Sequence, residues 1–424
     1  MQKKNLCFAS YFIGLLLLCG FRSPAVAQQS QQESDTPVDP CLKSTCRDVP
    51  LRENLSAIDL RTKDLGTKYV RGIVGGFAQG SGIAGGVQFT TAHAIPYLEM
   101  RAAALTSSSF DRRLDLEGVI NFAGTRNHAD AWFSYMQRQT DFFGIGPVSS
   151  SQMKTSFATD QRSYQGSIYR DFSGHLRGGV YTQVMNSHSG PGDNINDEPI
   201  TARFSGTRNQ PAESWIPGFL STTQILSYGS FFEYDTRDNS VDLTRGFDLY
   251  GRVASNDGMN NHAAFADYGW LEVEFDARGY IPLGSSRTSL ALRSRAQFKN
   301  PKGGSQIPFY DLSFLGGREF VRGYQSYRFR GNDLLMFSTE LRRTVYKKTD
   351  RRGVDVFAFA DSGQVWGDAR SSTLAAVQDF SSSKWRSGVG GGLQYRHSRG
   401  LAARLEVGRS NEGARIYASL SRGF

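Results

Sequence analysis

Two short motifs hold the residues of this sequence that are best suited to do chemistry. The first is GGREFVRGY at residues 316–324, in which Arg322 precedes Gly323, and the second is FADSG at residues 359–363, which contains Asp361. An arginine carries a planar fork that binds a carboxylate through two parallel hydrogen bonds, which are stronger than bonds between neutral groups. A glycine beside it permits a tight turn with unusual backbone angles. These residue types therefore suit a fixed ion pair that holds a loop in place.

Signals for catalysis or metal binding are missing from the sequence. The six histidines are scattered and form no H-E-x-x-H motif, and no G-x-S-x-G nucleophile motif occurs. A catalytic set assembled only in space stays open, because such partners need not be close in the sequence. We expect a protein that is not an enzyme, with no catalytic residue, no metal site and no cofactor.

The elements that must position the two motifs follow from composition and patterning. The chain has 424 residues, of which 39% are hydrophobic and 46 are glycine, and its mean hydropathy is -0.41. A membrane-spanning helix needs about 20 consecutive apolar residues. Only the N-terminus approaches this, with Lys3 and Lys4, an apolar centre and a small-residue site at Ala25 to Ala27. This pattern predicts a secretory signal peptide over residues 1–27.

Residues 28–64 are polar and show no periodicity, which predicts a flexible periplasmic tail. Cys41 and Cys46 lie in this tail, and an oxidising compartment would allow a disulfide between them. A metal site is the alternative, but no further ligands lie nearby. The formal charge of the whole chain is +9 and is dispersed. Because exported proteins rarely meet nucleic acid, we expect no nucleic-acid partner.

From residue 65 to residue 424 the sequence alternates between apolar and polar positions. In one segment Leu271, Val273 and Phe275 oppose Glu272 and Glu274. Together with export and an aromatic content of 12%, this alternation predicts an all-β protein, an antiparallel transmembrane β-barrel with apolar side chains toward lipid and polar side chains toward the lumen.

Counting the alternating segments gives sixteen strands, with fourteen or eighteen as the alternatives, and each strand is expected to span about 9 to 11 residues. An even count places both barrel ends in the periplasm and the long connections at residues 141–160, 186–222 and 299–333 on the outside. The predicted strands lie near Leu65, Ile83, Pro96, Leu114, Ala129, Gln161, His175, Thr223, Phe247, Trp270, Ser289, Leu334, Gly353, Arg386, Leu401 and Ala414.

With this count, the sequence resembles the BamA/TamA family of outer-membrane assembly barrels, the bacterial surface antigen superfamily. In that family a V-R-G-[FY] tip lies on the sixth external loop, between strands 11 and 12, which folds back into the barrel, and an F-x-D-x-G motif lies on strand 13. Residues 142–146 and 234–239 add weaker matches, and Phe424 resembles the C-terminal assembly signal. The resemblance covers residues 65–424.

The resemblance implies a set of site residues. The loop tip would consist of Val321, Arg322, Gly323 and Tyr324, and its partners in the lumen would be Asp361, Glu340, Phe359 and Gly363. Our hypothesis is that Asp361 and Glu340 clamp Arg322 inside the barrel. The alternative is that this cluster stabilises the fold and has no part in transport.

One departure from the family affects the expected function. The segment between Gln28 and Lys63 is shorter than the roughly 40 residues that a folded unit requires, so the polypeptide-transport-associated domains of the family are not expected here. The resemblance implies assembly or translocation of proteins, or of lipids, in the outer membrane of a Gram-negative bacterium. The partners would be the lipid bilayer, unfolded outer-membrane or secreted proteins, and a separate periplasmic subunit.

A passive pore or structural barrel is the alternative function. Arginines at interior positions of the predicted strands would make such a pore favour anions, and the candidates are Arg293, Arg295, Arg404 and Arg415.

Overall fold

The computed structural model describes residues 58–60, 70–75, 83–91, 97–192, 197–204, 216–237, 244–259, 268–284, 287–349, 352–367, 380–396 and 402–420. All of them belong to the unit Asp48–Phe424. Among these residues no helix is both long and apolar enough to cross a membrane. The predicted disulfide residues Cys41 and Cys46, the signal peptide and Phe424 lie outside the described residues.

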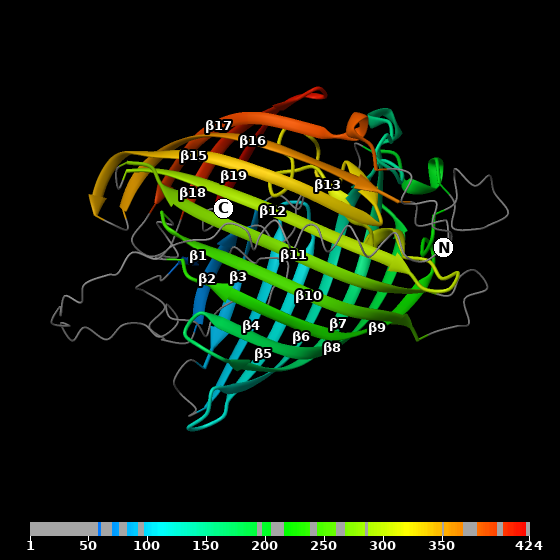
Figure 1. Cartoon of the computed structure of the whole chain (residues 1–424). Coiled ribbons are helices and arrows are strands. Elements are labelled where there is room, and N and C mark those ends of the chain that lie inside the picture. The colour runs from blue at the N-terminus through cyan, green and yellow to red at the C-terminus, as the bar shows by residue number, and fades with distance from the viewer. Residues whose placement is uncertain are drawn as a thin grey trace, which may run out of the picture. The chain divides into compact units, whose positions relative to one another are not determined.

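The unit is a curved antiparallel sheet in which each strand pairs with the next along the chain (Figure 1). In the described part of the chain, sixteen strands form this succession: β2 (Val70–Gly75), β3 (Ala84–Thr90), β4 (Leu98–Ser107), β5 (Arg112–Asn121), β6 (Asn127–Phe142), β7 (Thr155–Asp171), β8 (Leu176–Pro191), β9 (Thr222–Asp235), β10 (Gly246–Gly258), β11 (Gly269–Pro282), β12 (Thr288–Pro301), β15 (Asp333–Thr349), β16 (Arg352–Trp366), β17 (Arg386–Arg396), β18 (Ala402–Ser410) and β19 (Gly413–Leu420). The predicted sixteen-stranded antiparallel barrel is confirmed.

The strands place apolar side chains on the outer face and polar side chains on the inner face, the reverse of a soluble protein. In β11, Leu271 and Phe275 are 49% and 38% exposed, whereas Glu272 and Glu274 are 4% and 5% exposed. β18 alternates in the same way: Leu405 is exposed, whereas its neighbours Arg404 and Glu406 are buried. Apolar side chains on the outer face and polar ones on the inner face are the pattern of a barrel in lipid.

Several strands are longer than the sequence indicated. β7 and β8 remain paired from Phe157 opposite Pro191 down to Asp171 opposite Arg177, so this hairpin extends into the expected connections at 141–160 and 186–222. Those two expected boundaries were wrong. The inward residues of β7 and β8 in these stretches are small and polar, including buried Ser156, Ser187 and Ser189. This composition is typical of a loop, although the backbone pairing of the sheet continues through it.

The first and last strands of the succession, β2 and β19, are hydrogen-bonded neighbours in the strand order. Within the described residues they contact each other less than any other neighbouring pair of the succession does. A further short strand, β1 (Ile58–Leu60), pairs with β2, with Asp59 opposite Ile73. This strand lies within residues 28–64, the predicted periplasmic tail. We call the junction of β2 and β19 the seam.

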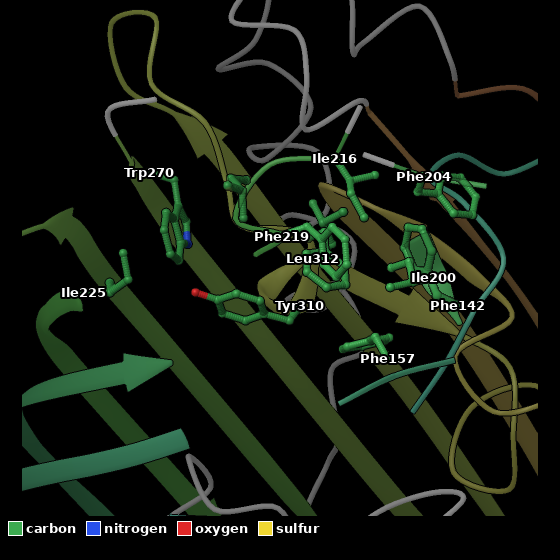
Figure 2. Packing of buried hydrophobic residues seen from close by; sticks show 12 residues of the cluster. Phe142, Phe157, Ile200, Phe204, Ile216, Phe219, Ile225, Trp270, Tyr310 and Leu312 are labelled. Atoms are coloured by element: carbon green, nitrogen blue, oxygen red, sulfur yellow. The ribbon is translucent and has the colours of Figure 1, made fainter. Parts of the chain in front are cut away.

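The connections on one side of the barrel are long, and apolar side chains fill the space between them. Phe142, Phe157, Ile225 and Trp270 come from the strands, and they meet residues of the β8–β9 and β12–β15 connections (Figure 2). We call this group the outer cluster; its other members are Ile200, Phe204, Ile216, Phe219, Ile307, Phe309, Tyr310 and Leu312. The ring of Phe309 contacts those of Phe142 and Phe157 edge to face. The outer cluster therefore fixes the base of the β12–β15 connection.

Candidate functional site: the loop tip and its lumen partners

The connection between β12 and β15 forms the site. It contains a short helical turn, η4 (Phe309–Asp311), and two short strands that pair with each other, β13 (Ser313–Leu315) and β14 (Phe329–Gly331). The residues between these two strands form the loop tip. Gly316, Gly317 and Gly323 have φ values of 107°, 97° and 99°, a region that residues with a side chain rarely adopt. These glycines allow the tip to reverse direction within a short span.

Arg322 and Asp361 are joined by three hydrogen bonds. The Arg322 guanidinium donates from Nε and Nη2 to the two carboxylate oxygens of Asp361, both at 2.7 Å, and the Arg322 backbone N–H donates to Oδ2 at 3.0 Å. Ser338 on β15 donates to Oδ1 at 2.6 Å. Both charged residues are 2% exposed. This is the bidentate geometry that makes an arginine–carboxylate pair strong and directional.

The remaining nitrogen of the guanidinium, Nη1, faces two more carboxylates. It lies 3.1 Å from Glu340 on β15 and 3.1 Å from Glu406 on β18. Burial disfavours the charged form of Arg322, but the hydrogen bond and charge of Asp361 and the charges of the two glutamates outweigh it, so the pKa of Arg322 is raised above its ordinary value. The arginine is thus permanently charged and bound to three separate strands.

Other arginines balance the surplus negative charge around the tip. Arg404 on β18 lies 2.9 Å from Glu340 and 3.2 Å from Glu406, and Arg342 lies 2.5 Å from Glu340. Together with Arg322 and Asp361, these residues form a network of three cations and three anions. A buried ionic network costs little only when every member is paired, and this one is.

Apolar contacts complete the seat of the tip. The guanidinium carbon of Arg322 lies 3.4 Å from the ring centroid of Phe359, a cation–π arrangement. Val321 and Tyr324 are buried in a cluster whose other members are Leu315, Phe320, Phe329, Leu334, Met336 and Val365. Gly363 leaves room there, because a Cβ on it would lie 3.0 Å from the Leu315 side chain.

Glycines on β17 and β18 form a groove for the tip backbone. A Cβ on Gly388 would overlap the carbonyl oxygen of Arg322, and a Cβ on Gly408 would lie 2.8 Å from the backbone nitrogen of Gly323. Glycines also allow close approach of ring to backbone: a Cβ on Gly390 would lie 2.6 Å from the ring of Phe359. The loop tip therefore contacts the inner wall of the barrel backbone to backbone.

The structure brings together all eight residues that the resemblance implied for the tip and its lumen partners. The sequence analysis missed Glu406, Ser338, Arg342 and the glycine groove, and it assigned Arg404 to a pore. A weak signal existed for Glu406, which shares the inward face of β18 with Arg404. No spacing in the sequence indicates that the loop lies against that face.

The interior arginines on β12 are also paired. Arg293 lies 2.7 Å from Asp276, and Arg295 lies 2.7 Å from Glu274. Of the four arginines that a pore would use, these two and Arg404 therefore have carboxylate partners. A third inward arginine, Arg252 on β10, lies 2.5 Å from Glu272.

One group of carboxylates in the described residues lies close enough together to hold a cation: Glu233, Asp235 and Asp248. Arg237 lies 2.8 Å from Asp235 and 3.1 Å from Asp248. Because an arginine already supplies the positive charge, this group is a salt-bridge cluster, and we assign no metal to it.

Asp311 is an acid at the base of the loop, in η4 and outside the strands. Burial raises the pKa of its carboxyl from 3.8 to about 6, although the charge of Lys299 lowers it. Lys299 also donates to the backbone carbonyl oxygen of Asp311. Protonation of this carboxyl therefore falls in the mildly acidic range.

Comparison with known proteins agrees with this geometry. The Omp85 superfamily domain matches residues 121–409, about two thirds of the chain. The solved structure of BamA from Haemophilus ducreyi lacking POTRA domains 1–3 is similar, with 15% identity, a TM-score of 0.58, and coverage of 83% of this chain and 68% of that one. CdiB from Escherichia coli is similar with 12% identity, a TM-score of 0.52, and coverage of 84% and 62%. At these identities the two structures support the fold.

Proposed function

The chain belongs to the Omp85 superfamily, and from this premise we propose that it acts in the outer membrane of a Gram-negative bacterium, where it assists the assembly or translocation of proteins. Lipids are a second class of cargo under the same proposal. The observation that carries the proposal is the loop tip itself: Arg322 binds carboxylates of β15, β16 and β18, so one loop joins three strands of the wall.

The proposed mechanism uses no cofactor and no catalytic residue. The seam between β2 and β19 separates, and the exposed backbone groups of an edge strand form hydrogen bonds with an incoming strand. Two observations support this. Within the described residues β2 and β19 contact each other less than other neighbouring strands of the succession do, and β1 already pairs with β2 as an added strand. Glycines in β2 and β3, such as Gly72 and Gly85, weaken strand packing near the seam.

The second candidate function is a passive, anion-favouring pore or a structural barrel. Two observations count against the pore. Arg293 and Arg295 are neutralised by Asp276 and Glu274, which removes most of the positive field that would attract anions. The outer cluster also fills the space between the long connections with apolar side chains.

The deciding experiment is depletion of the protein from its own bacterium, followed by quantitative mass spectrometry of the outer membrane. The proposal expects one or more outer-membrane or secreted proteins to decrease, and to return when the wild-type gene is restored. Unchanged levels, combined with an anion-selective conductance in planar bilayers, would favour the pore.

A separate periplasmic subunit is a further part of the proposal. Affinity purification from gently solubilised membranes would identify that subunit. Recovery of the barrel alone after mild crosslinking would argue that it receives clients directly.

A further inference from the structure

The loop tip touches the last hairpin of the barrel, β18–β19, without any side chain between the two backbones. A Cβ on Gly323 would stand 2.7 Å from the carbonyl carbon of Arg409 and 2.8 Å from the nitrogen of Ser410. Gly323 has a φ of 99°, and both its N–H and its carbonyl oxygen form hydrogen bonds with the hairpin. This contact is distinct from the ion pairs, which act through the side chain of Arg322.

The phenol of Tyr417 on β19 bridges the tip. Its oxygen accepts a hydrogen bond from the Gly323 N–H at 2.9 Å, and its O–H donates to the carbonyl oxygen of Tyr324 at 2.9 Å. Ser410, at the end of β18, donates to the carbonyl oxygen of Gly323 at 2.9 Å. In return, the Tyr324 phenol donates to Asn411 at 2.6 Å. Four uncharged hydrogen bonds thus connect two residues of the tip to one hairpin.

Ionic and uncharged contacts both reach the last hairpin, but they use different groups of the tip. The Arg322 side chain binds Asp361 on β16 and Glu340 on β15, and it also binds Glu406 on β18, where Arg404 completes the network. In the turn of the hairpin, Glu412 lies 2.8 Å from Arg328. The uncharged bonds of Tyr417 and Ser410 instead hold the backbone of Gly323 and Tyr324. The tip therefore has charged anchors through its side chains and an uncharged anchor through its backbone.

The uncharged anchor matters because it acts on β19 itself. β19 pairs with β18 from Ala403 opposite Leu420 to Ser410 opposite Gly413, and within the described residues β19 contacts β2 less than any other neighbouring strands of the succession contact each other. Tyr417 holds the tip backbone through two hydrogen bonds, and Ser419 accepts one from Arg318 at 3.3 Å. The position of the β19 edge therefore depends on the β18 ladder together with these contacts to the loop.

We propose that Tyr417 is a positioning residue that fastens the last hairpin to the loop tip, so that the loop sets how readily the β19 side of the seam separates. Loss of the phenol breaks two hydrogen bonds and leaves the ion pairs of Arg322 intact. Movement of the tip would release β19 in the same way. The importance of this for client entry rests on the proposed function, whereas the mechanical link itself does not.

Hydrogen–deuterium exchange of the full-length purified protein in detergent tests the link. The variant is Tyr417→Phe, which removes only the hydroxyl, and the control is Tyr164→Phe, a phenol on the lipid side of β7 that is half exposed. We expect exchange of amides in β18–β19 to become about tenfold faster in Tyr417→Phe. Two hydrogen bonds are lost, and the net free energy of each is about half of the free energy that corresponds to a tenfold change in rate. Exchange in β6–β7 and the temperature of unfolding should match those of the control.

Ser410→Ala provides a second variant, although Ser410 also accepts a hydrogen bond from the Glu412 N–H within the turn. It should accelerate exchange in the same hairpin. The inference is overturned if β18–β19 exchange stays at the wild-type rate in both variants, or if all strands accelerate equally, which would be a general loss of stability. Faster local exchange without any change in outer-membrane protein levels would leave the link standing and count against the proposed function.

Discussion

Asp361 receives three hydrogen bonds from Arg322, two from the guanidinium at 2.7 Å and one from the backbone N–H at 3.0 Å. The backbone bond means that the carboxylate fixes the position of the tip as well as the direction of the side chain. A strand residue therefore determines where the loop sits inside the barrel. This relationship is the basis of the predictions that follow.

Replacing either member of the pair should destabilise the barrel. Asp361→Asn leaves a buried arginine with one fewer counter-charge, and Arg322→Lys removes the planar fork, so we expect a loss of about 3 kcal/mol for each. Reversible urea unfolding in lipid vesicles measures the loss. Arg162→Lys, whose side chain is 59% exposed, is the matched control and should change stability by less than about 0.5 kcal/mol.

A double-mutant cycle separates the pair from its surroundings. The combined variant should lose much less than the sum of the single losses, because each single change already breaks the same bidentate contact. Strict additivity would show that Arg322 and Asp361 do not interact in the membrane.

Closing the glycine groove should displace the tip without unfolding the strands. In Gly388→Ala the new methyl group would overlap the Arg322 carbonyl oxygen, whereas a Cβ on Gly118 of β5 has no atom within 4 Å. The Arg322 backbone N–H donates to Asp361, and we expect hydrogen–deuterium exchange of this amide to be faster in Gly388→Ala than in Gly118→Ala. Equal exchange rates in the two variants would contradict the groove.

Mild acid should stabilise the seating of the loop base through Asp311. Its pKa is raised from 3.8 to about 6 by burial, so the folded state holds its proton more tightly than the unfolded state does. The stabilising contribution is complete below pH 3.8 and is lost as the pH rises through about 6. Compared with Asp311→Asn, the wild type should lose roughly 3 kcal/mol across that range. The measurement is the free energy of unfolding by urea as a function of pH. The same pH dependence in the wild type and in Asp311→Asn would refute the raised pKa of Asp311.

The paired lumen should give the wild-type barrel low conductance with little preference for anions. Arg295 has Glu274 as its partner, so Arg295→Gln should leave the reversal potential in a salt gradient nearly unchanged. A strong anion preference that falls in Arg295→Gln would support the pore instead. The measurement is single-channel recording in planar bilayers.

The succession of strands could be predicted from the sequence because its signal is local. Apolar and polar residues alternate on opposite faces of a strand, and this placed strands near Trp270, Ser289 and Leu334, where β11, β12 and β15 begin. The failures lie where inward residues are small and polar. Ser156 forms part of the β6–β7 ladder and Ser189 part of the β7–β8 ladder, but serine is equally common in loops.

The candidate site was only partly predictable. Arg322 and Asp361 lie in motifs, so the resemblance could identify them. Tyr417 and Glu406 belong to alternating strands and were assignable to the polar face, but their partner is a loop about 80 to 90 residues away in the sequence, as the separations of 84 and 94 for their hydrogen bonds show. Such contacts arise from closure of the sheet, which no local pattern reveals.

The most direct test of the central claim, that this barrel handles polypeptides at its seam, is site-specific photocrosslinking in living cells. A photoreactive amino acid is placed at position 73 in β2, the position opposite Asp59 of β1, and in a control at position 164 in β7. The account predicts adducts with other polypeptides at position 73 that the control does not give. Correctly folded protein that yields no polypeptide adducts at position 73, or equal adducts at both positions, would contradict it.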